Sequence, residues 1–232
     1  MKIKICGLFR EADIDYVNEA APDYIGFVFV RESRRYVAPE KAAALRKRLR
    51  EGIVPVGVFV RAGPEDIAAL YREGIISVVQ LHGGEDDAYI AKLRKLCTDP
   101  LRAGTLSPFP LIRAVDAGAL GVKTAGAAVV TTAAEACGFS AEPDGIAAGA
   151  DYLLIDNGKG GTGKSFDWSL LDSFPQAAVS ARVFLAGGLG LHNIGEAARR
   201  RPYAIDVSSG AETDGVKDRE KIVSLVKYVR PA

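Results

Sequence analysis

The sequence predicts an α/β fold, a single parallel eight-stranded barrel of the (β/α)8 or TIM type, and two observations favour it. Short apolar runs alternate with amphipathic stretches about eight times along the chain, which is the order of a parallel sheet with crossover helices. The length of 232 residues suits one closed barrel and is long for a simple doubly wound domain. We therefore expect residues 1–232 to form one barrel domain, with an extended connection before the sixth strand.

The expected strands are short and rich in Val, Ile, Phe and Tyr, as strands buried on both faces are. They span Ile3–Cys6, Tyr24–Val30, Val54–Val60, Ser77–His82, Leu111–Val115, Asp151–Asp156, Arg182–Ala186 and Tyr203–Val207. The expected helices carry apolar residues on one face and charges on the other. They span Pro39–Arg50, Pro64–Arg72, Asp87–Cys97, Asn193–Arg200 and Asp218–Val229.

Two connections resist this pattern. The stretch Asp116–Gly149 is rich in Ala and Gly and shows no clear helix limits, so we expect it to hold one barrel helix and an inserted segment. Leu96–Pro110 contains three prolines and also lacks a clear period.

Composition excludes several classes of protein. The formal net charge of +1 indicates neither a nucleic-acid partner nor a membrane surface, although a local site for a small anion remains compatible with it. Cys6, Cys97 and Cys137 form no paired spacing, so we expect no disulfide framework, no zinc motif and a reducing compartment. The start of the chain does not fit a signal peptide, and no apolar run reaches the roughly 18 residues of a membrane span. We expect a soluble cytoplasmic protein.

Polar and glycine residues gather where the expected strands end, and in such barrels the active site lies at the C-terminal ends of the strands. They are Cys6-Gly7, Ser33-Arg34-Arg35-Tyr36, Gln80-Leu81-His82-Gly83, Asp156 with Gly158–Lys164, Gly187-Gly188, and Ser208-Ser209-Gly210. Packing alone does not explain such residues at six strand ends.

The glycine-rich strand ends favour a phosphate site. Glycine lets backbone N–H groups approach an anion closely, and barrels commonly bind phosphate at the loops after strands seven and eight. The candidates are Gly160, Gly161, Thr162, Gly163, Gly187, Gly188, Ser208, Ser209 and Gly210. Any one glycine pair is more simply a tight turn, but three neighbouring strand ends together favour phosphate. The letters of Gly158–Ser165 also satisfy a Walker string, but Phe166-Asp167-Trp168 is a poor helix start for that motif.

Strand alternation predicts a buried ion pair. Lys4 shares a face with Cys6, and Asp206 shares a face with Ser208, on strands that are neighbours once a barrel closes. A buried lysine needs a counter-charge, so we expect Lys4 to pair with Asp206. The alternative is a Schiff-base lysine, as in aldolase-type barrels.

Position alone leaves the roles of the titratable residues open. Cys6 lies beside Gly7 at the barrel mouth, where it is either an inert core thiol or a thiolate stabilised by nearby cations. Asp156 either caps a turn or acts as a general acid with a raised pKa. His82 is a ligand or, as we favour, a hydrogen-bonded structural residue, and we expect His192 to face solvent.

Together these segments resemble the phosphoribosylanthranilate isomerase family. The similar segments follow in family order and overlap six of the eight expected strands. They are Lys4–Gly7, Gly26–Phe29, Ser33–Tyr36, Val56–Phe59, Val79–Gly83, Gly160–Trp168, Ala186–Leu189 and Ile205–Gly210.

The resemblance implies an Amadori rearrangement of a phosphorylated aminosugar, the third step of tryptophan synthesis, without metal or organic cofactor. By position, Cys6 is then the general base, Asp156 the general acid, and Arg35 the partner of the anthranilate carboxylate. Gln80, His82 and Asp206 would contact the substrate, and the glycine loops would hold its phosphate. We expect a monomer or homodimer.

The sequence departs from the family in two places. Asp116–Ala150 is longer than is usual in the family, and Arg113 stands where a lysine is common. Two other hypotheses stay open: a lysine-dependent aldolase that uses Lys4, and a barrel that binds a phosphorylated metabolite without converting it.

Overall fold

The computed structural model describes residues 1–97, 109–117, 150–157, 167–174 and 176–230. Eight strands pair in parallel and close into a barrel in the order β1-β2-β3-β4-β5-β6-β7-β8, which confirms the predicted fold class. The strands are β1 (Lys2–Cys6), β2 (Tyr24–Val28), β3 (Val54–Phe59), β4 (Val78–Leu81), β5 (Leu111–Asp116), β6 (Tyr152–Asp156), β7 (Val183–Leu185) and β8 (Ala204–Val207).

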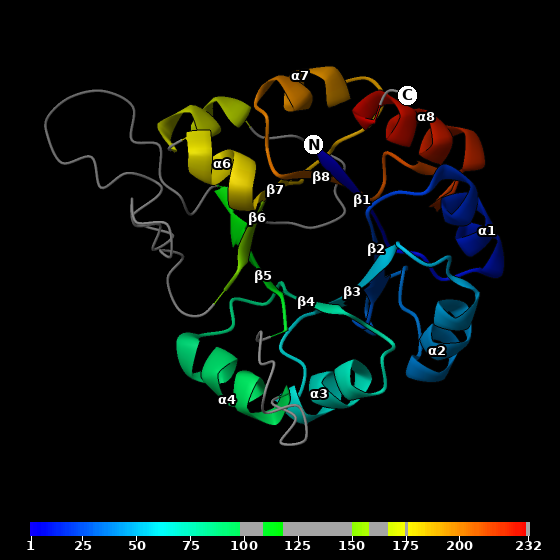
Figure 1. Cartoon of the computed structure of the whole chain (residues 1–232), viewed down its shortest axis with the longest axis vertical. Coiled ribbons are helices and arrows are strands. Elements are labelled where there is room, and N and C mark those ends of the chain that lie inside the picture. The colour runs from blue at the N-terminus through cyan, green and yellow to red at the C-terminus, as the bar shows by residue number, and fades with distance from the viewer. Residues whose placement is uncertain (98–108, 118–149, 158–166, 175, 231–232) are drawn as a thin grey trace, which may run out of the picture.

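Helices surround this ring of strands (Figure 1). They are α1 (Glu11–Ala20), α2 (Pro39–Arg48), α3 (Pro64–Arg72), α4 (Asp87–Cys97), the 3₁₀ helix η4 (Trp168–Ser173), α6 (Gln176–Arg182), α7 (Ile194–Arg199) and α8 (Arg219–Val229). A short antiparallel hairpin, β9 (Glu212–Thr213) with β10 (Val216–Lys217), lies between β8 and α8. The five helices expected from the sequence are all present, while α1 and α6 were not expected.

Several predicted limits were wrong. Arg182 was expected to be the first residue of the strand Arg182–Ala186, but it is the last residue of α6. The Ala-rich segment before it favours a helix, and arginine also has a high helix propensity. β2 stops at Val28, since a turn already begins at Val30, whose carbonyl accepts from the backbone N–H of Ser33 at 2.9 Å. Most of the expected extended connection, Asp116–Ala150, lies outside the described residues.

Asp167 and Trp168, where the sequence predicts a poor helix start for a Walker motif, are among the described residues. The side chain of Asp167 accepts a hydrogen bond from the backbone N–H of Ser169 at 2.9 Å, so it caps η4 at Trp168. The result is a 3₁₀ helix rather than the α-helix that a Walker motif requires.

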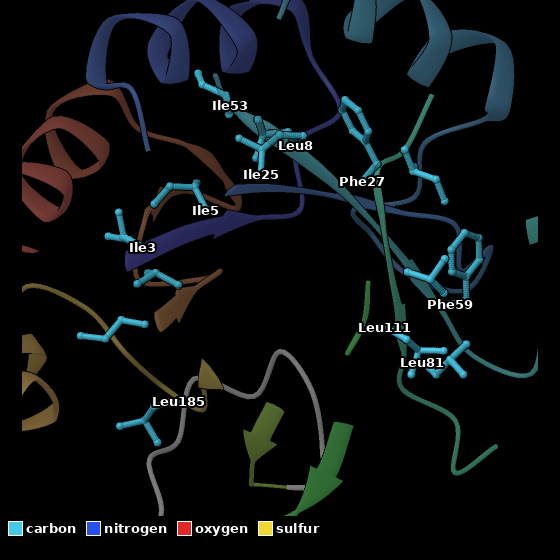
Figure 2. Close-up of a cluster of buried hydrophobic side chains, with 14 of the residues drawn as sticks. Ile3, Ile5, Leu8, Ile25, Phe27, Ile53, Phe59, Leu81, Leu111 and Leu185 are labelled. Carbon is cyan, nitrogen blue, oxygen red and sulfur yellow. The ribbon is translucent and has the colours of Figure 1, made fainter. Parts of the chain in front are cut away.

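The main apolar core lies between the strands and the helices. Ile3 and Ile5 of β1, Ile25 and Phe27 of β2, and Leu8 are fully buried there (Figure 2). Because side chains alternate along a strand, the residues between them, such as Lys4 and Cys6, point into the barrel.

The barrel interior changes from apolar to polar along the strands. Near the strand starts, the rings of Tyr24, Tyr152 and Tyr203 pack around Phe184, with centroids 5.4 to 5.5 Å from it. These rings pack inside the barrel near the strand starts, away from the polar residues at the C-terminal ends of the strands.

Candidate active site

A cavity of about 320 Å³ opens at the C-terminal ends of the strands. It is lined by ten of the residues that the sequence singled out: Cys6, Arg35, Gln80, His82, Asp156, Gly187, Gly188, Asp206, Ser208 and Ser209. Gly210, which follows Ser209, is not among the residues that line the cavity, and Gly160, Gly161, Thr162 and Gly163 fall outside the described residues. Barrel closure therefore gathers side chains from β1, β4, β6 and β8 around one space.

Cys6 lies at the end of β1 and is buried beside Gly26 of β2. A Cβ atom at Gly26 would lie 2.6 Å from the Cys6 sulfur, so glycine leaves the room that the thiol needs. Burial raises the pKa of Cys6, while the ammonium groups of Lys4 and Lys217 act to lower it. The thiol is thus the resting form, and two cations favour its thiolate.

Asp156 ends β6 and is also buried. Burial raises the pKa of Asp156, although the backbone N–H of Asn157, which donates to its Oδ1 at 2.7 Å, and His82 oppose that rise. Asp116, its register partner on β5, raises the pKa further. A carboxyl group with a raised pKa keeps its proton at a higher pH, as a general acid must.

His82 lies between two other cavity residues. Its Nδ1 is 3.2 Å from the Gln80 side-chain nitrogen, and its Nε2 is 3.7 Å from Asp156 Oδ2. Burial lowers the pKa of His82 even though Asp156 opposes this, so the imidazole is neutral at neutral pH. His82 therefore has structural contacts, as the sequence favoured, and it also faces the cavity. His192 is exposed, as expected.

The predicted ion pair between Lys4 and Asp206 is confirmed. Lys4 is fully buried, and its Nζ donates to Asp206 Oδ2 at 2.9 Å. Burial acts to lower the pKa of Lys4, but Asp206 and Cys6 together outweigh it, and the net shift is upward. A lysine held in its protonated form is not a Schiff-base nucleophile, which argues against the aldolase alternative.

Arg35 crosses the barrel mouth and is 7% exposed. Its Nε and Nη2 donate to the two carboxylate oxygens of Glu212 at 2.6 and 3.0 Å. Gly7, with φ of +86°, lies directly beneath, and a Cβ atom there would be 2.3 Å from Arg35 Cδ. Glycine at position 7 thus allows both the positive φ of the turn after β1 and the close approach of the Arg35 side chain.

The loops after β7 and β8 form one glycine-lined rim. Gly187 and Gly188 have φ of +86° and +63°, which side chains rarely adopt. Gly210 is bridged to Gly190, and a Cβ atom at Gly210 would lie 1.9 Å from the carbonyl oxygen of Leu189. This close backbone approach requires glycine and suits a site where N–H groups meet an anion.

Two buried residues beside the cavity were not predicted from the sequence. Glu212 and Lys217 belong to the β9–β10 hairpin, and Lys217 Nζ donates both to Glu212 Oε1 at 2.7 Å and to the Ser208 carbonyl at 2.9 Å. Strands of two residues are too short to show an alternation of apolar and polar residues. The only sign of this hairpin in the sequence is that Glu212 and Lys217, of opposite charge, follow the glycine loop that ends at Gly210.

Other features of the described residues bear on the kind of site. No group of three or more His, Cys, Asp and Glu side chains there is placed to hold a metal ion. None of the helices in the described segments is long and apolar enough to cross a membrane.

The closed barrel and the cavity at its C-terminal rim define a (β/α)8-barrel enzyme. A family model described as N-(5'phosphoribosyl)anthranilate (PRA) isomerase matches residues 3–99 and 134–228. The chain belongs to the phosphoribosylanthranilate isomerase family.

Individual relatives agree with this assignment. The chain is 38% identical to an N-(5'-phosphoribosyl)anthranilate isomerase of Endomicrobium trichonymphae, over 99% of this chain and 98% of the relative. It resembles monomers generated from the dimeric phosphoribosylanthranilate isomerase of Thermotoga maritima, at 29% identity and a TM-score of 0.71 over 100% of both chains. It also resembles a phosphoribosylanthranilate isomerase in complex with reduced 1-(o-carboxyphenylamino)-1-deoxyribulose 5-phosphate, at 27% identity and a TM-score of 0.70 over 100% of both chains.

Proposed function

We propose that this chain isomerises N-(5-phosphoribosyl)anthranilate to its 1-deoxyribulose form, with Asp156 as general acid and Cys6 as general base. The observation that carries the proposal is that these two side chains, from β6 and β1, line the same cavity. One bound sugar can then meet both groups.

The acid acts first. Asp156 donates its proton to the ribose ring oxygen, the bond from that oxygen to C1′ breaks, and the nitrogen lone pair forms the protonated Schiff base. The raised pKa of Asp156 supports this role, because the proton must still be present near neutral pH. The negative charge that forms on Asp156 then raises the pKa of His82, whose Nε2 lies 3.7 Å from Asp156 Oδ2, so a protonated imidazole can offset that charge.

The base acts next. The Cys6 thiolate removes the proton from C2′, and the electron pair moves to give an enolamine, which tautomerises to the ketone. Burial makes the thiolate the minor form in the empty cavity, so the nearby ammonium groups of Lys4 and Lys217 support its formation.

The remaining polar groups bind the two ends of the substrate. Arg35 holds the anthranilate carboxylate, since a planar guanidinium matches a carboxylate. The rim formed by Gly187-Gly188 and Ser208-Ser209-Gly210 holds the phosphate, and we also assign phosphate binding to Gly160, Gly161, Thr162 and Gly163. Gln80, His82 and Asp206 contact the sugar.

We extend the proposal to the rest of the chain. Residues 1–232 form one barrel domain that acts without a cofactor in the cytoplasm, as a monomer or homodimer. The family match omits residues 100–133, which overlap the long connection Asp116–Ala150. That departure does not involve Cys6, Asp156 or the two rim loops.

Turnover of purified protein tests the assignment of roles. We expect loss of anthranilate-type fluorescence with phosphoribosylanthranilate, and a decrease in rate of roughly 10²–10⁴-fold in Cys6→Ala and in Asp156→Asn. Cys97→Ala, which removes a buried thiol outside the cavity, is the matched control and should keep normal turnover. Growth of a tryptophan auxotroph that lacks this step should depend on the same two residues. Normal turnover in either cavity variant would disprove its role.

A further inference from the structure

The carboxylate of Glu212 accepts hydrogen bonds from three basic side chains. Arg35 Nε and Lys217 Nζ donate to Oε1 at 2.6 and 2.7 Å, and Arg35 Nη2 and Arg34 Nη2 donate to Oε2 at 3.0 and 2.7 Å. The side chains of Glu212 and Lys217 are almost completely buried, at 4% and 0% exposed. Burial acts to raise the pKa of Glu212, but Arg35 and Lys217 outweigh it and keep the group ionised.

The hairpin that carries this carboxylate is fixed on both sides. Glu212 and Lys217 are register partners across β9 and β10, so their side chains share one face. Lys221 Nζ donates to the Glu212 carbonyl at 2.7 Å, and Arg10 Nη2 donates to the Lys217 carbonyl at 2.7 Å. The position of Glu212 is therefore set independently of Arg35, as a support for another side chain must be.

The cluster has more positive than negative charge. The guanidinium groups of Arg34 and Arg35 share one carboxylate with the amine of Lys217, whose pKa burial lowers although Glu212 opposes this. Of these four residues only Arg35 lines the cavity. Glu212 uses one edge of the Arg35 guanidinium, and among the described residues nothing accepts a hydrogen bond from Nη1 on the other edge. A second carboxylate, brought into the cavity by a ligand, would meet that edge and offset the excess charge.

We propose that Glu212 is a positioning residue that, together with Lys217, holds the guanidinium of Arg35 ready for the carboxylate on the aromatic ring of the substrate. This inference rests on the proposed function and deepens it. A free arginine side chain must lose much rotational freedom when it binds, and a partner that fixes it beforehand removes that cost. Glu212 thereby contributes to selectivity for a ring that bears a carboxylate.

Two ligands that differ only in this group test the proposal. One is the product analogue reduced 1-(o-carboxyphenylamino)-1-deoxyribulose 5-phosphate, and the other is the same molecule without the carboxyl group. In Glu212→Gln, which keeps the shape and removes the charge, we expect roughly ten-fold or greater weakening of the carboxylated ligand. Binding of the ligand without the carboxyl group should change less than about two-fold, and KM should rise more than kcat falls.

Matched variants separate positioning from folding. Asp214→Asn removes one exposed negative charge from the same hairpin and should leave both affinities unchanged. Glu212→Asp keeps the charge and should restore part of the selectivity, which also supplies a test if Glu212→Gln does not fold.

The possible outcomes are distinct. Equal weakening of both ligands in Glu212→Gln, or no weakening of either, would overturn the positioning role. If the unaltered protein binds neither ligand and has no turnover, the proposed function itself fails. If it turns substrate over but does not distinguish the two ligands, only the selectivity inference fails.

Discussion

Replacing Asp206 by asparagine would leave the ammonium group of Lys4 buried without its counter-charge. Lys4 has no exposed surface, and its Nζ lies 2.9 Å from Asp206 Oδ2. Removing one partner of a buried pair typically costs about 3–5 kcal/mol, because the other charge stays in a medium of low dielectric constant. Asp206 borders the cavity, where water can reach it, so we expect a loss near the lower limit.

That loss is measurable as a melting temperature. A loss of about 3 kcal/mol corresponds to a decrease of roughly 6–12 °C in Tm for a domain of this size. Lys4→Met should cost less than Asp206→Asn, because the carboxylate that remains in Lys4→Met lines the cavity, whereas the ammonium group that remains in Asp206→Asn is fully buried. The double variant Lys4→Met/Asp206→Asn should be more stable than Asp206→Asn alone, since no charge is left buried.

The pH dependence of stability that Lys4 causes should have opposite signs in the unaltered protein and in Asp206→Asn. In the unaltered protein the pKa of Lys4 is raised, so its contribution is present below the unfolded value of about 10.4 and is lost as pH rises through the folded pKa. In Asp206→Asn, burial dominates and the folded pKa falls below the unfolded value. The unfolded chain then binds more protons, so stability should rise from neutral pH toward about pH 10.

Urea unfolding of the four proteins at neutral and alkaline pH tests this reasoning. It would be refuted if Asp206→Asn lost less than about 1 kcal/mol, or if the double variant were less stable than Asp206→Asn. A stability of Asp206→Asn that falls between neutral and alkaline pH would also contradict it.

Three further predictions concern the cavity. Asp156→Asn should lower kcat yet raise Tm near neutral pH. The pKa of Asp156 is raised in the folded protein, so its carboxyl group makes the folded protein less stable as pH rises and the group ionises; a lower Tm in Asp156→Asn would contradict this. Alkylation of Cys6 should be slow near pH 7 and accelerate as pH rises through its raised pKa, and fast labelling at pH 7 would exclude that shift. Gly210→Ala should cost roughly 3 kcal/mol or more and raise the KM for the phosphorylated substrate, because the new Cβ meets the Leu189 carbonyl. Gly52→Ala, at φ +89° in open space, should cost only about 1 kcal/mol, and equal losses for the two would exclude the steric cause.

Much of the fold can be read from the sequence because its signals are local. Buried parallel strands require continuous apolar runs, and eight such runs closed into the expected barrel. Side-chain alternation has a period of two, so strand order alone placed Lys4 opposite Asp206. The helix α1 was missed, since it begins without proline or a common capping side chain and is followed by Ala21, in the left-handed conformation, rather than by a glycine.

By itself, then, the sequence determined the barrel, the position of the site at the ends of its strands and the residue types gathered there. It could do so because the alternation of side chains along a strand, and of strands with helices along the chain, fixes where each residue lies in a closed barrel. Only the tertiary structure decided the electrostatics. The pKa of Asp156 depends on burial and on His82 from another strand, and Arg35 finds its counter-charge in Glu212, 177 residues away. Such contacts depend on how irregular loops run, and a loop has no regular pattern of apolar and polar residues from which the partner of a side chain can be inferred.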